Sequence, residues 1–163
     1  MSEKRLTHLD DAGNARMVDV TEKAPTDRRA VARGRVRMTR ETLELVAKGE
    51  APKGDVFTVA KVAGIMAAKR TAETIPMCHP VPVTGVELKL WANFDVPAVE
   101  IEAAVRTHAP TGVEMEALAA VAAAALTVYD MCKSAEMGMV IEGVRLVEKS
   151  GGRRGDYKAP GNG

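Results

Sequence analysis

The residues best suited to proton-transfer chemistry in this sequence of 163 residues are Asp130 and Lys133. They stand in a stretch without helix breakers, and side chains at positions i and i+3 of a helix lie about 5–6 Å apart. A carboxylate beside an ammonium group can exchange protons with a substrate. The same spacing also fits an ordinary surface ion pair, worth a few tenths of a kcal/mol. The pair alone leaves both interpretations open.

Lys53 is a further cation in an unusual position. It precedes Asp55, a good N-cap for a helix that we predict over residues 56–74. The N-terminal end of a helix carries partial positive charge, so a lysine beside it gains no local stabilisation. Lys53 is therefore either fully solvated or placed there for an anionic ligand, and the sequence pattern leaves these two interpretations even.

Residues 75–82 form a loop in which three prolines surround Cys78 and His79. Prolines restrict the backbone and remove amide donors. The Cys-His pair suggests a metal site, but the other candidate ligands, Cys132, His8 and His108, have no zinc-type spacing. We therefore predict no metal site, and instead a stiff loop that presents one imidazole as a hydrogen-bond donor or acid–base group.

A long helix is predicted over residues 111–133, where Thr111 and Glu114 match the capping-box pattern. At about 100° per residue, one side of this helix is core, and the opposite side carries two carboxylates separated by small residues. Such a face leaves room for another backbone or for a ligand. The predicted core side consists of Leu118, Val121, Ala122, Ala125, Val128, Tyr129 and Cys132, and the opposite side of Glu116, Ala120, Ala123, Thr127 and Asp130.

The elements that must position these residues indicate an α+β protein. Their order is strand, helices, strand, strand, long helix, strand, as in a ferredoxin-like split β-α-β fold with a four-stranded antiparallel sheet and helices packed on one face. The other face would stay free, which favours association with a second copy. The alternating patterns place strands over residues 31–38, 86–92, 99–106 and 139–147, with a possible bulge at Gly143, and a short helix over residues 40–48 between Thr39 and Gly49.

The ends of the chain are polar, and we predict a flexible arm over residues 1–30, a ferredoxin-like domain over residues 31–149 and a flexible tail over residues 150–163. The alternative for the arm is that it orders over a site and brings Asp19, Lys23 and Arg28 to it. Arginines at positions 33, 35 and 37 share one face of the first predicted strand. They could bind phosphate, but more often such a row is the solvated side of a sheet.

Bulk composition excludes several classes of function. A net charge of +1 and an aromatic content of 3% give no basis for binding nucleic acid. No apolar run approaches the roughly 18 residues that span a bilayer, and the first residues lack a hydrophobic signal region. The two cysteines are far apart among apolar neighbours, which suits reduced thiols. We therefore expect a cytoplasmic protein with no membrane or nucleic-acid partner.

Several blocks of the sequence resemble the MoaC family, the cyclic pyranopterin monophosphate synthases of molybdenum cofactor biosynthesis. The similarity runs over residues 6–157, and Met77 stands where the family has Leu before Cys-His-Pro, a conservative difference. The blocks are MVDV at 17–20, KGDV at 53–56, AGI at 63–65, AAKRT at 67–71, IPMCHP at 75–80, TGVEMEAL at 111–118, LTVYDMCK at 126–133 and KSGG at 149–152.

The resemblance implies a lyase whose substrate is a cyclised dihydro-GTP. The product is a pyranopterin carrying a cyclic phosphate, released together with pyrophosphate. Such chemistry calls for repeated proton transfers and for neutralisation of the triphosphate charge. No cofactor is implied, and Mg²⁺ would enter only as a counter-ion of the triphosphate. The resemblance also implies a homohexamer, a trimer of dimers with active sites at the subunit interfaces.

Carried onto this sequence, the resemblance assigns proton transfer to Asp130, Lys133 and Lys53. We expect clustered cations to lower the pKa of a lysine toward neutrality. Cys78 is expected to pack the loop rather than act as a nucleophile, and Glu114 to cap the helix. The residues implied in substrate binding are Met77, Cys78, His79, Met115 and Glu116, with His79, Lys69, Arg70, Lys149 and Arg28 for the phosphates.

Glu116 and Asp130 would lie about 21 Å apart along one helix, given its rise per residue. That is longer than a bound nucleotide spans while both groups touch its reacting end. We therefore predict that one active site takes Glu116 from one subunit and Asp130 from another. Two other classes of function stay open: a catalytically inert ligand-binding oligomer on the same fold, and a metal-dependent hydrolase.

Overall fold

An antiparallel sheet forms one layer of the protein, for which a computed structural model describes residues 12–152 and 155–160. The strands within that part of the chain follow the order β2-β3-β1-β4-β5. Strands β1 and β3 pair along their whole length, and β4 pairs with β1 on its other side. The strands are β1 (Thr26–Arg37), β2 (Val83–Asn93), β3 (Ala98–Ala109), β4 (Val140–Ser150) and β5 (Tyr157–Lys158).

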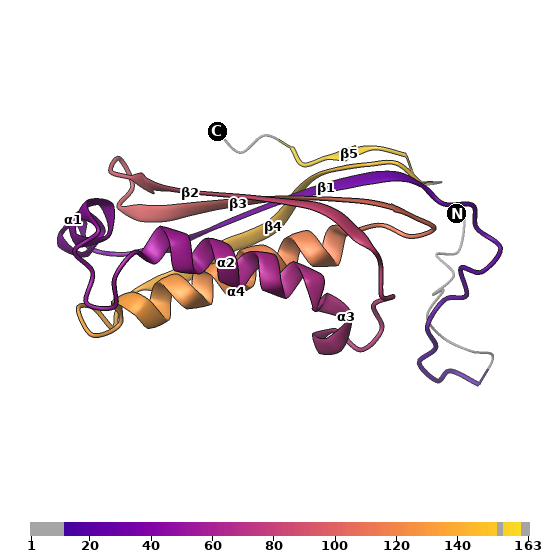
Figure 1. Cartoon of the computed structure of the whole chain (residues 1–163), viewed down its shortest axis with the longest axis horizontal. Helices are drawn as coiled ribbons and strands as arrows, with labels where there is room; N and C mark the ends of the chain where they lie inside the picture. The colour runs from indigo at the N-terminus through magenta and orange to yellow at the C-terminus, as the bar shows by residue number, and fades with distance from the viewer. Residues whose placement is uncertain (1–11, 153–154, 161–163) are drawn as a thin grey trace.

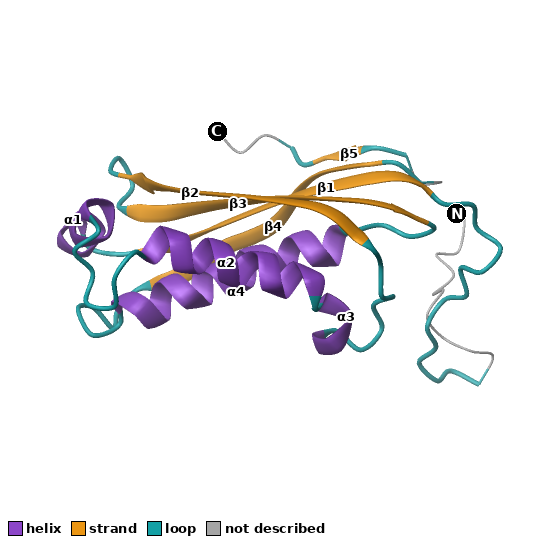
Figure 2. Cartoon of the chain, in the orientation of Figure 1, coloured by secondary structure: helices purple, strands orange, loops and turns teal. Residues whose placement is uncertain are grey.

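The helices cover one face of this sheet, with α2 and α4 side by side and α1 at one end (Figures 1 and 2). They are α1 (Arg40–Lys48), α2 (Val56–Lys69), α3 (Thr71–Thr74) and α4 (Glu114–Cys132). The predicted α+β ferredoxin-like fold is confirmed. The sheet has five strands rather than the four expected, because Tyr157 and Lys158 pair with the end of β4.

Two of the predicted element boundaries differ most from the structure. Strand β1 begins at Thr26 rather than at residue 31, since its charged first residues are satisfied across the sheet: Asp27 pairs with His108, and Arg29 with Glu148. The helix predicted over residues 56–74 is interrupted after Lys69. There the Thr71 hydroxyl donates to the carbonyl oxygens of Ala67 and Ala68, which competes with continuation of the helix.

Local capping signals were reliable for α1 and α2 but not for α4. The side chains of Thr39 and Asp55 accept the backbone N–H groups of Thr42 and Thr58, and Gly49 ends α1 at a φ of 72°. The capping box predicted for Thr111 and Glu114 is wrong. Helix α4 starts after Val113 without a side-chain cap, because Glu114 is engaged by Lys149 at 2.9 Å.

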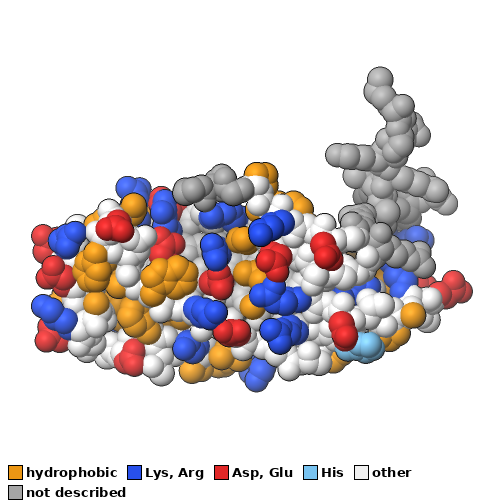
Figure 3. All heavy atoms as spheres, turned by 90° about the horizontal axis from the view of Figure 1, so that it is seen from above, with side chains coloured by type: hydrophobic (Ala, Val, Ile, Leu, Met, Phe, Trp, Pro, Cys, Tyr) orange, Lys and Arg blue, Asp and Glu red, His pale blue; other side chains and the backbone are white. Residues whose placement is uncertain are grey.

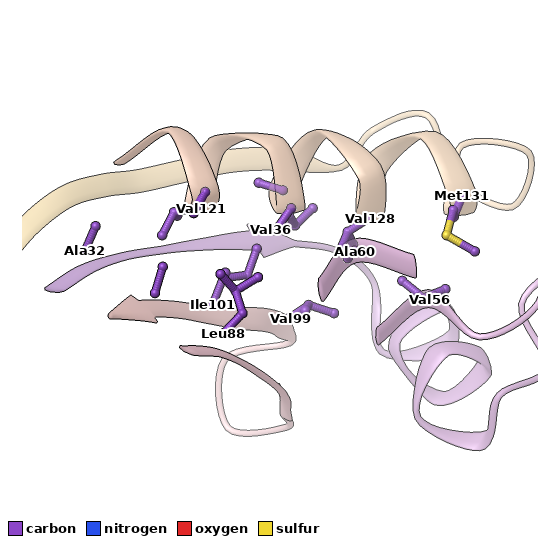
Figure 4. Close-up of a cluster of buried hydrophobic side chains, with 14 of the residues drawn as sticks. Ala32, Val36, Val56, Ala60, Leu88, Val99, Ile101, Val121, Val128 and Met131 are labelled. Carbon is purple, nitrogen blue, oxygen red and sulfur yellow. The ribbon is translucent and has the colours of Figure 1, made fainter. Parts of the chain in front are cut away.

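Helix α4 is buried on two sides rather than one. The predicted core residues Val121, Ala125, Val128 and Cys132 face the interior, as Figure 4 shows for the first and third of these. The assignment of Glu116 and Ala120 to an open face was wrong, because α2 packs there and leaves them 2% and 0% exposed. The small residues of α4 therefore make room for another backbone, that of α2 in the same chain.

The two helices approach each other closely at Gly64 of α2. A Cβ atom added to Gly64 would lie 2.8 Å from the carbonyl oxygen of Ala120 and 2.6 Å from a methyl carbon of Leu88. Glycine is therefore required there by the space between α2, α4 and β2. This contact fixes how α2 lies along α4, and with it the position of Lys53 just before α2.

The sheet face away from the helices is the solvated side, as the arginine row predicted. Arg33 donates to Glu102 at 2.7 Å and Arg35 to Glu142 at 2.8 Å. Figure 3 views this face and shows acidic and basic side chains interleaved with apolar ones. The cross-strand pairs satisfy the arginines without phosphate, and the bulge predicted at Gly143 interrupts the β1–β4 register beside them.

Helix α4 also corrects the expectation that no apolar run approaches a membrane-spanning length. By length and composition alone, Glu114–Cys132 is apolar enough to cross a bilayer. Half of that stretch is buried against α2 and the sheet, which is the environment of a core helix.

Candidate functional site

Asp130 is held between two lysines that come from different parts of the chain. Lys53, in the turn before α2, places Nζ 2.6 Å from Asp130 Oδ2, and Lys133, just after α4, places Nζ 2.6 Å from Oδ1. The three side chains are 47–52% exposed. The structure therefore brings together the three residues predicted for proton transfer, in a position that a ligand can reach. We call Lys53, Asp130 and Lys133 the Asp130 cluster.

The charges of the Asp130 cluster set its protonation states. Hydrogen bonds from Lys133 and then Lys53 lower the pKa of Asp130 to about 2. The hydrogen bond to Asp130 raises the pKa of Lys133. The expected lowering of a lysine pKa by clustered cations is thus wrong for Lys133, because the carboxylate between the two ammonium groups has the larger effect.

Glu116 forms a second group of candidate residues near the start of α4. It lines a hollow of about 130 Å³ together with Lys69, Arg70 and Pro80. Its Oε1 accepts a hydrogen bond from the Cys78 thiol at 3.6 Å, whereas Oε2 is buried and has no partner within the described chain. Burial raises the pKa of Glu116 above its ordinary value. We call the hollow and these residues the Glu116 pocket.

The stiff loop meets the N-terminal arm at His79. The Nε2 atom of His79 lies 2.6 Å from the carbonyl oxygen of Val18, so the tautomer that donates from Nε2 fits this contact. Asp19 follows in the arm, where hydrogen bonds from Thr21 lower its pKa. This part of the arm therefore lies against the loop that carries Cys78, as the alternative of an arm over a site requires.

Two of the cations expected to bind phosphate are engaged within the chain. Lys149 pairs with Glu114 at 2.9 Å, and Arg28 donates to the carbonyl oxygens of Ala109 and Pro110 at 3.0 and 3.1 Å. Burial would raise the pKa of Glu114, but hydrogen bonds from Lys149 and from its own backbone N–H, together with the charges of Lys149 and Arg28, outweigh burial and lower the pKa. The sequence pattern placed Glu114 in a helix cap and did not indicate its pairing with Lys149, 35 positions away.

The described part of the chain contains no cluster of three or more His, Cys, Asp or Glu side chains that could hold a metal ion. Cys78 and His79 point to separate contacts, with Glu116 and with Val18. Met77 and Met115 are neighbours of Cys78 and Glu116 in sequence, but neither lines the hollow of the Glu116 pocket. Met77 is partly buried, and Met115 is 37% exposed.

A comparison with protein families matches residues 17–152 to the MoaC family. This range covers most of the chain and includes every candidate residue of both groups, from Arg28 to Lys149. The chain belongs to the MoaC family.

Curated MoaC relatives are similar along nearly their whole length. A protein of Thermomicrobium roseum is 61% identical over 94% of this chain and 92% of its own. One of Cereibacter sphaeroides is 58% identical over 94% and 97%, and one of Pelotomaculum thermopropionicum is 58% identical over 96% and 92%. All three are named cyclic pyranopterin monophosphate synthase.

Within this MoaC chain the two groups do not meet. Glu116 stands in the first turn of α4, and Asp130 in the last. Their separation of about 21 Å along the axis follows from the helical rise. One chain therefore carries two separate groups of polar residues, one built on each end of α4.

Proposed function

We propose that this MoaC-family chain is a lyase that converts a cyclised dihydro-GTP into cyclic pyranopterin monophosphate and releases pyrophosphate. The names of relatives that match over more than nine-tenths of their length support the proposal. The observation that carries it is the Asp130 cluster. Two exposed lysines at hydrogen-bond distance from one carboxylate supply both proton donors and an acceptor at one point.

The Asp130 cluster would move protons as the substrate rearranges. Because its pKa is about 2, Asp130 is ionised at neutral pH and holds both ammonium groups in place. An ammonium group of Lys53 or Lys133 would donate to a leaving nitrogen or oxygen, and the neutral amine that forms would accept the next proton. A substrate phosphate arriving beside Asp130 would compete for these lysines.

The Glu116 pocket would receive the other end of the substrate. Lys69 and Arg70 are exposed at its rim, where they can neutralise phosphate charge. Lys149 and Arg28 become phosphate ligands only by leaving Glu114 and the carbonyl groups that they now bind. His79 would likewise exchange the Val18 carbonyl for a phosphate oxygen.

The proposal includes a homohexamer, a trimer of dimers in which each active site joins the Asp130 cluster of one subunit to the Glu116 pocket of another. The distance of about 21 Å along α4 supports it, since one small substrate does not span both groups of one chain. Apolar side chains on the outer side of the helices also support it. Val59, Val62 and Met66 of α2 and Leu126 of α4 are 45–61% exposed.

The proposal also places the enzyme in the cytoplasm, with no resident cofactor and with Mg²⁺ only as a counter-ion of the triphosphate. Turnover should therefore persist in a strong chelator once the substrate is supplied free of metal. A metal-dependent hydrolase would lose its activity under the same conditions.

The test of the proposed function is an assay with the cyclised dihydro-GTP itself, in which the pterin product is detected by fluorescence after oxidation. The wild-type chain should form product, and Asp130→Asn should lower kcat/KM by about a hundredfold or more, the range of general acid–base catalysis.

The matched control is Asp95→Asn, which changes an exposed carboxylate in the turn between β2 and β3 and should leave turnover unchanged. A wild-type chain that binds the intermediate without forming product would overturn the proposal in favour of an inert binding protein.

A further inference from the structure

The contact between Cys78 and Glu116 joins the stiff loop to the buried start of α4. The thiol sulfur lies 3.6 Å from Glu116 Oε1. Glu116 is 2% exposed, so water does not replace this contact. Pro76 and Pro80 flank Cys78 and restrict the loop backbone, which limits the positions open to the thiol. The geometry is that of a fixed donor on a buried carboxyl group.

A carboxylate buried to this degree depends on the donors that reach it. A charged group without partners in a protein interior is costly, and it becomes protonated when its donors are too few. The Cys78 thiol is the side-chain donor to Glu116 in the described chain, and Oε2 has no partner. Removing the thiol would therefore leave both oxygens without a side-chain donor.

The other charged groups around Glu116 come from three elements. Lys69 and Arg70, at the end of α2, and Glu73 of α3 line the same hollow, and Glu114 precedes Glu116 on α4. Burial raises the pKa of Glu116, hydrogen bonds from its own backbone N–H and from Cys78 lower it, and the charge of Glu114 raises it further. Burial together with the charge and hydrogen bond of Glu116 raises the pKa of the Cys78 thiol to about 11. The high pKa of the Cys78 thiol keeps it protonated, so that it can donate to the carboxylate.

We propose that Cys78 is a positioning residue, whose thiol holds Glu116 ionised and oriented so that the carboxylate can accept an N–H group of the bound substrate. This inference rests on the proposed function for the identity of the substrate. Its donor would be the amino and ring N–H edge of the purine-derived ring, because such an edge pairs with a carboxylate. Cys78 itself takes no part in a covalent step, since a thiol with so high a pKa is a poor nucleophile.

The first experiment needs no turnover. Alkylation of the wild-type chain and of Glu116→Gln by iodoacetamide is followed for each cysteine by mass spectrometry, between about pH 7 and pH 10. Loss of the carboxylate charge should speed alkylation of Cys78 about threefold or more at a given pH. Cys132 is the internal control for the fold, because it is buried in the core and should react slowly in both chains. An unchanged alkylation rate at Cys78 would show that its thiol does not contact the Glu116 carboxylate.

The second experiment compares Cys78→Ala and Cys78→Ser by the pH profile of kcat/KM. Cys78→Ala should move the acidic limb to higher pH, because the ionised form of Glu116 loses its donor. Cys78→Ser should restore the limb, because a hydroxyl also donates. A merely structural role would lower activity without this shift, and identical limbs in the two variants would overturn the proposal. If the wild-type chain shows no turnover, the proposed function fails, while the alkylation result still reports on Cys78.

Discussion

At the scale of single residues, the Asp130 cluster shows how a neighbour from a distant part of the chain changes what a local pair can do. Asp130 and Lys133 form the ion pair that their spacing allows. Lys53 adds a second ammonium group on the other carboxylate oxygen. With both oxygens occupied, Asp130 is ionised at every pH at which the protein is expected to work, and its effect on Lys133 keeps that lysine charged.

Lys53→Ala should raise the pKa of Asp130 from about 2, because it removes the second of the two hydrogen bonds that lower it. The carboxyl carbon of Asp130, followed by NMR during an acid titration, reports this directly. Lys61→Ala is the matched control, because it removes an exposed lysine of α2 that is not among the groups that shift the pKa of Asp130. A titration of Asp130 that is the same in both variants would contradict the geometry of the cluster.

The same pKa predicts how acid affects the fold. The pKa of Asp130 is depressed, so its contribution to stability is present above its unfolded-state value of about 3.9. It is lost as the pH falls from there through about 2. Asp130→Asn should therefore weaken the dependence of the free energy of unfolding on pH between about pH 3.9 and about pH 2, because asparagine does not titrate there. Thermal unfolding at a series of acidic pH values measures this, and an unaltered dependence would argue against the two hydrogen bonds.

At the scale of elements, the packing of α2 on α4 decides where the candidate residues lie. The small residues of α4 receive α2, and this burial converts Glu116 from a surface residue into the floor of a pocket. The same packing carries Lys53, before α2, to the end of α4 where Asp130 stands. Both groups therefore depend on one helix-to-helix contact.

Gly64→Ala should destabilise the protein by up to about 2 kcal/mol. The added methyl group meets the Ala120 carbonyl oxygen and Leu88, and overpacking of this kind typically costs about 1–3 kcal/mol. The higher helix propensity of alanine offsets about 1 kcal/mol of that cost. Urea unfolding at one fixed protein concentration measures the difference. Gly85→Ala, where the added Cβ has no neighbour within 4 Å, is the control. A stabilised Gly64→Ala would show that the helices do not approach this closely.

At the scale of the whole molecule, two features support an active site shared between subunits. They are the distance between the Asp130 cluster and the Glu116 pocket, and the apolar outer side of the helices. Packing of α2 and α4 against a second subunit would cover Val62 and Leu126, which are 53% and 61% exposed in one chain. An antiparallel arrangement about a twofold axis would bring the Glu116 pocket of each chain toward the Asp130 cluster of the other.

Mixing Glu116→Ala with Asp130→Asn, each inactive alone, should restore activity after dissociation and reassembly. If each site takes one group from each of two subunits, random mixing in equal amounts gives about a quarter of wild-type activity, because both wild-type groups meet in one site out of four. Each variant reassembled with itself is the control. Hybrids demonstrated by mass spectrometry but without any activity would exclude a shared site.

Patterns within a few residues determined much of this protein. The caps at Thr39 and Asp55, the strand alternation and the order of elements were enough to predict the ferredoxin-like layers, because each depends on neighbours along the chain. The MoaC blocks supplied the remaining candidate residues. The flexibility expected of residues 1–30 and 150–163 stays a prediction, and its parts at residues 1–11, 153–154 and 161–163 lie outside the described residues.

Only the tertiary structure decided which side chains share a surface. Lys53 meets Asp130 across 77 positions of sequence, and Lys149 meets Glu114 across 35, distances over which no local periodicity carries information. The burial of Glu116 was missed for the same reason, since a helix periodicity shows two opposite faces but not that a second helix covers one of them. Sequence determined the chemistry available to this protein, and packing determined where that chemistry is brought together.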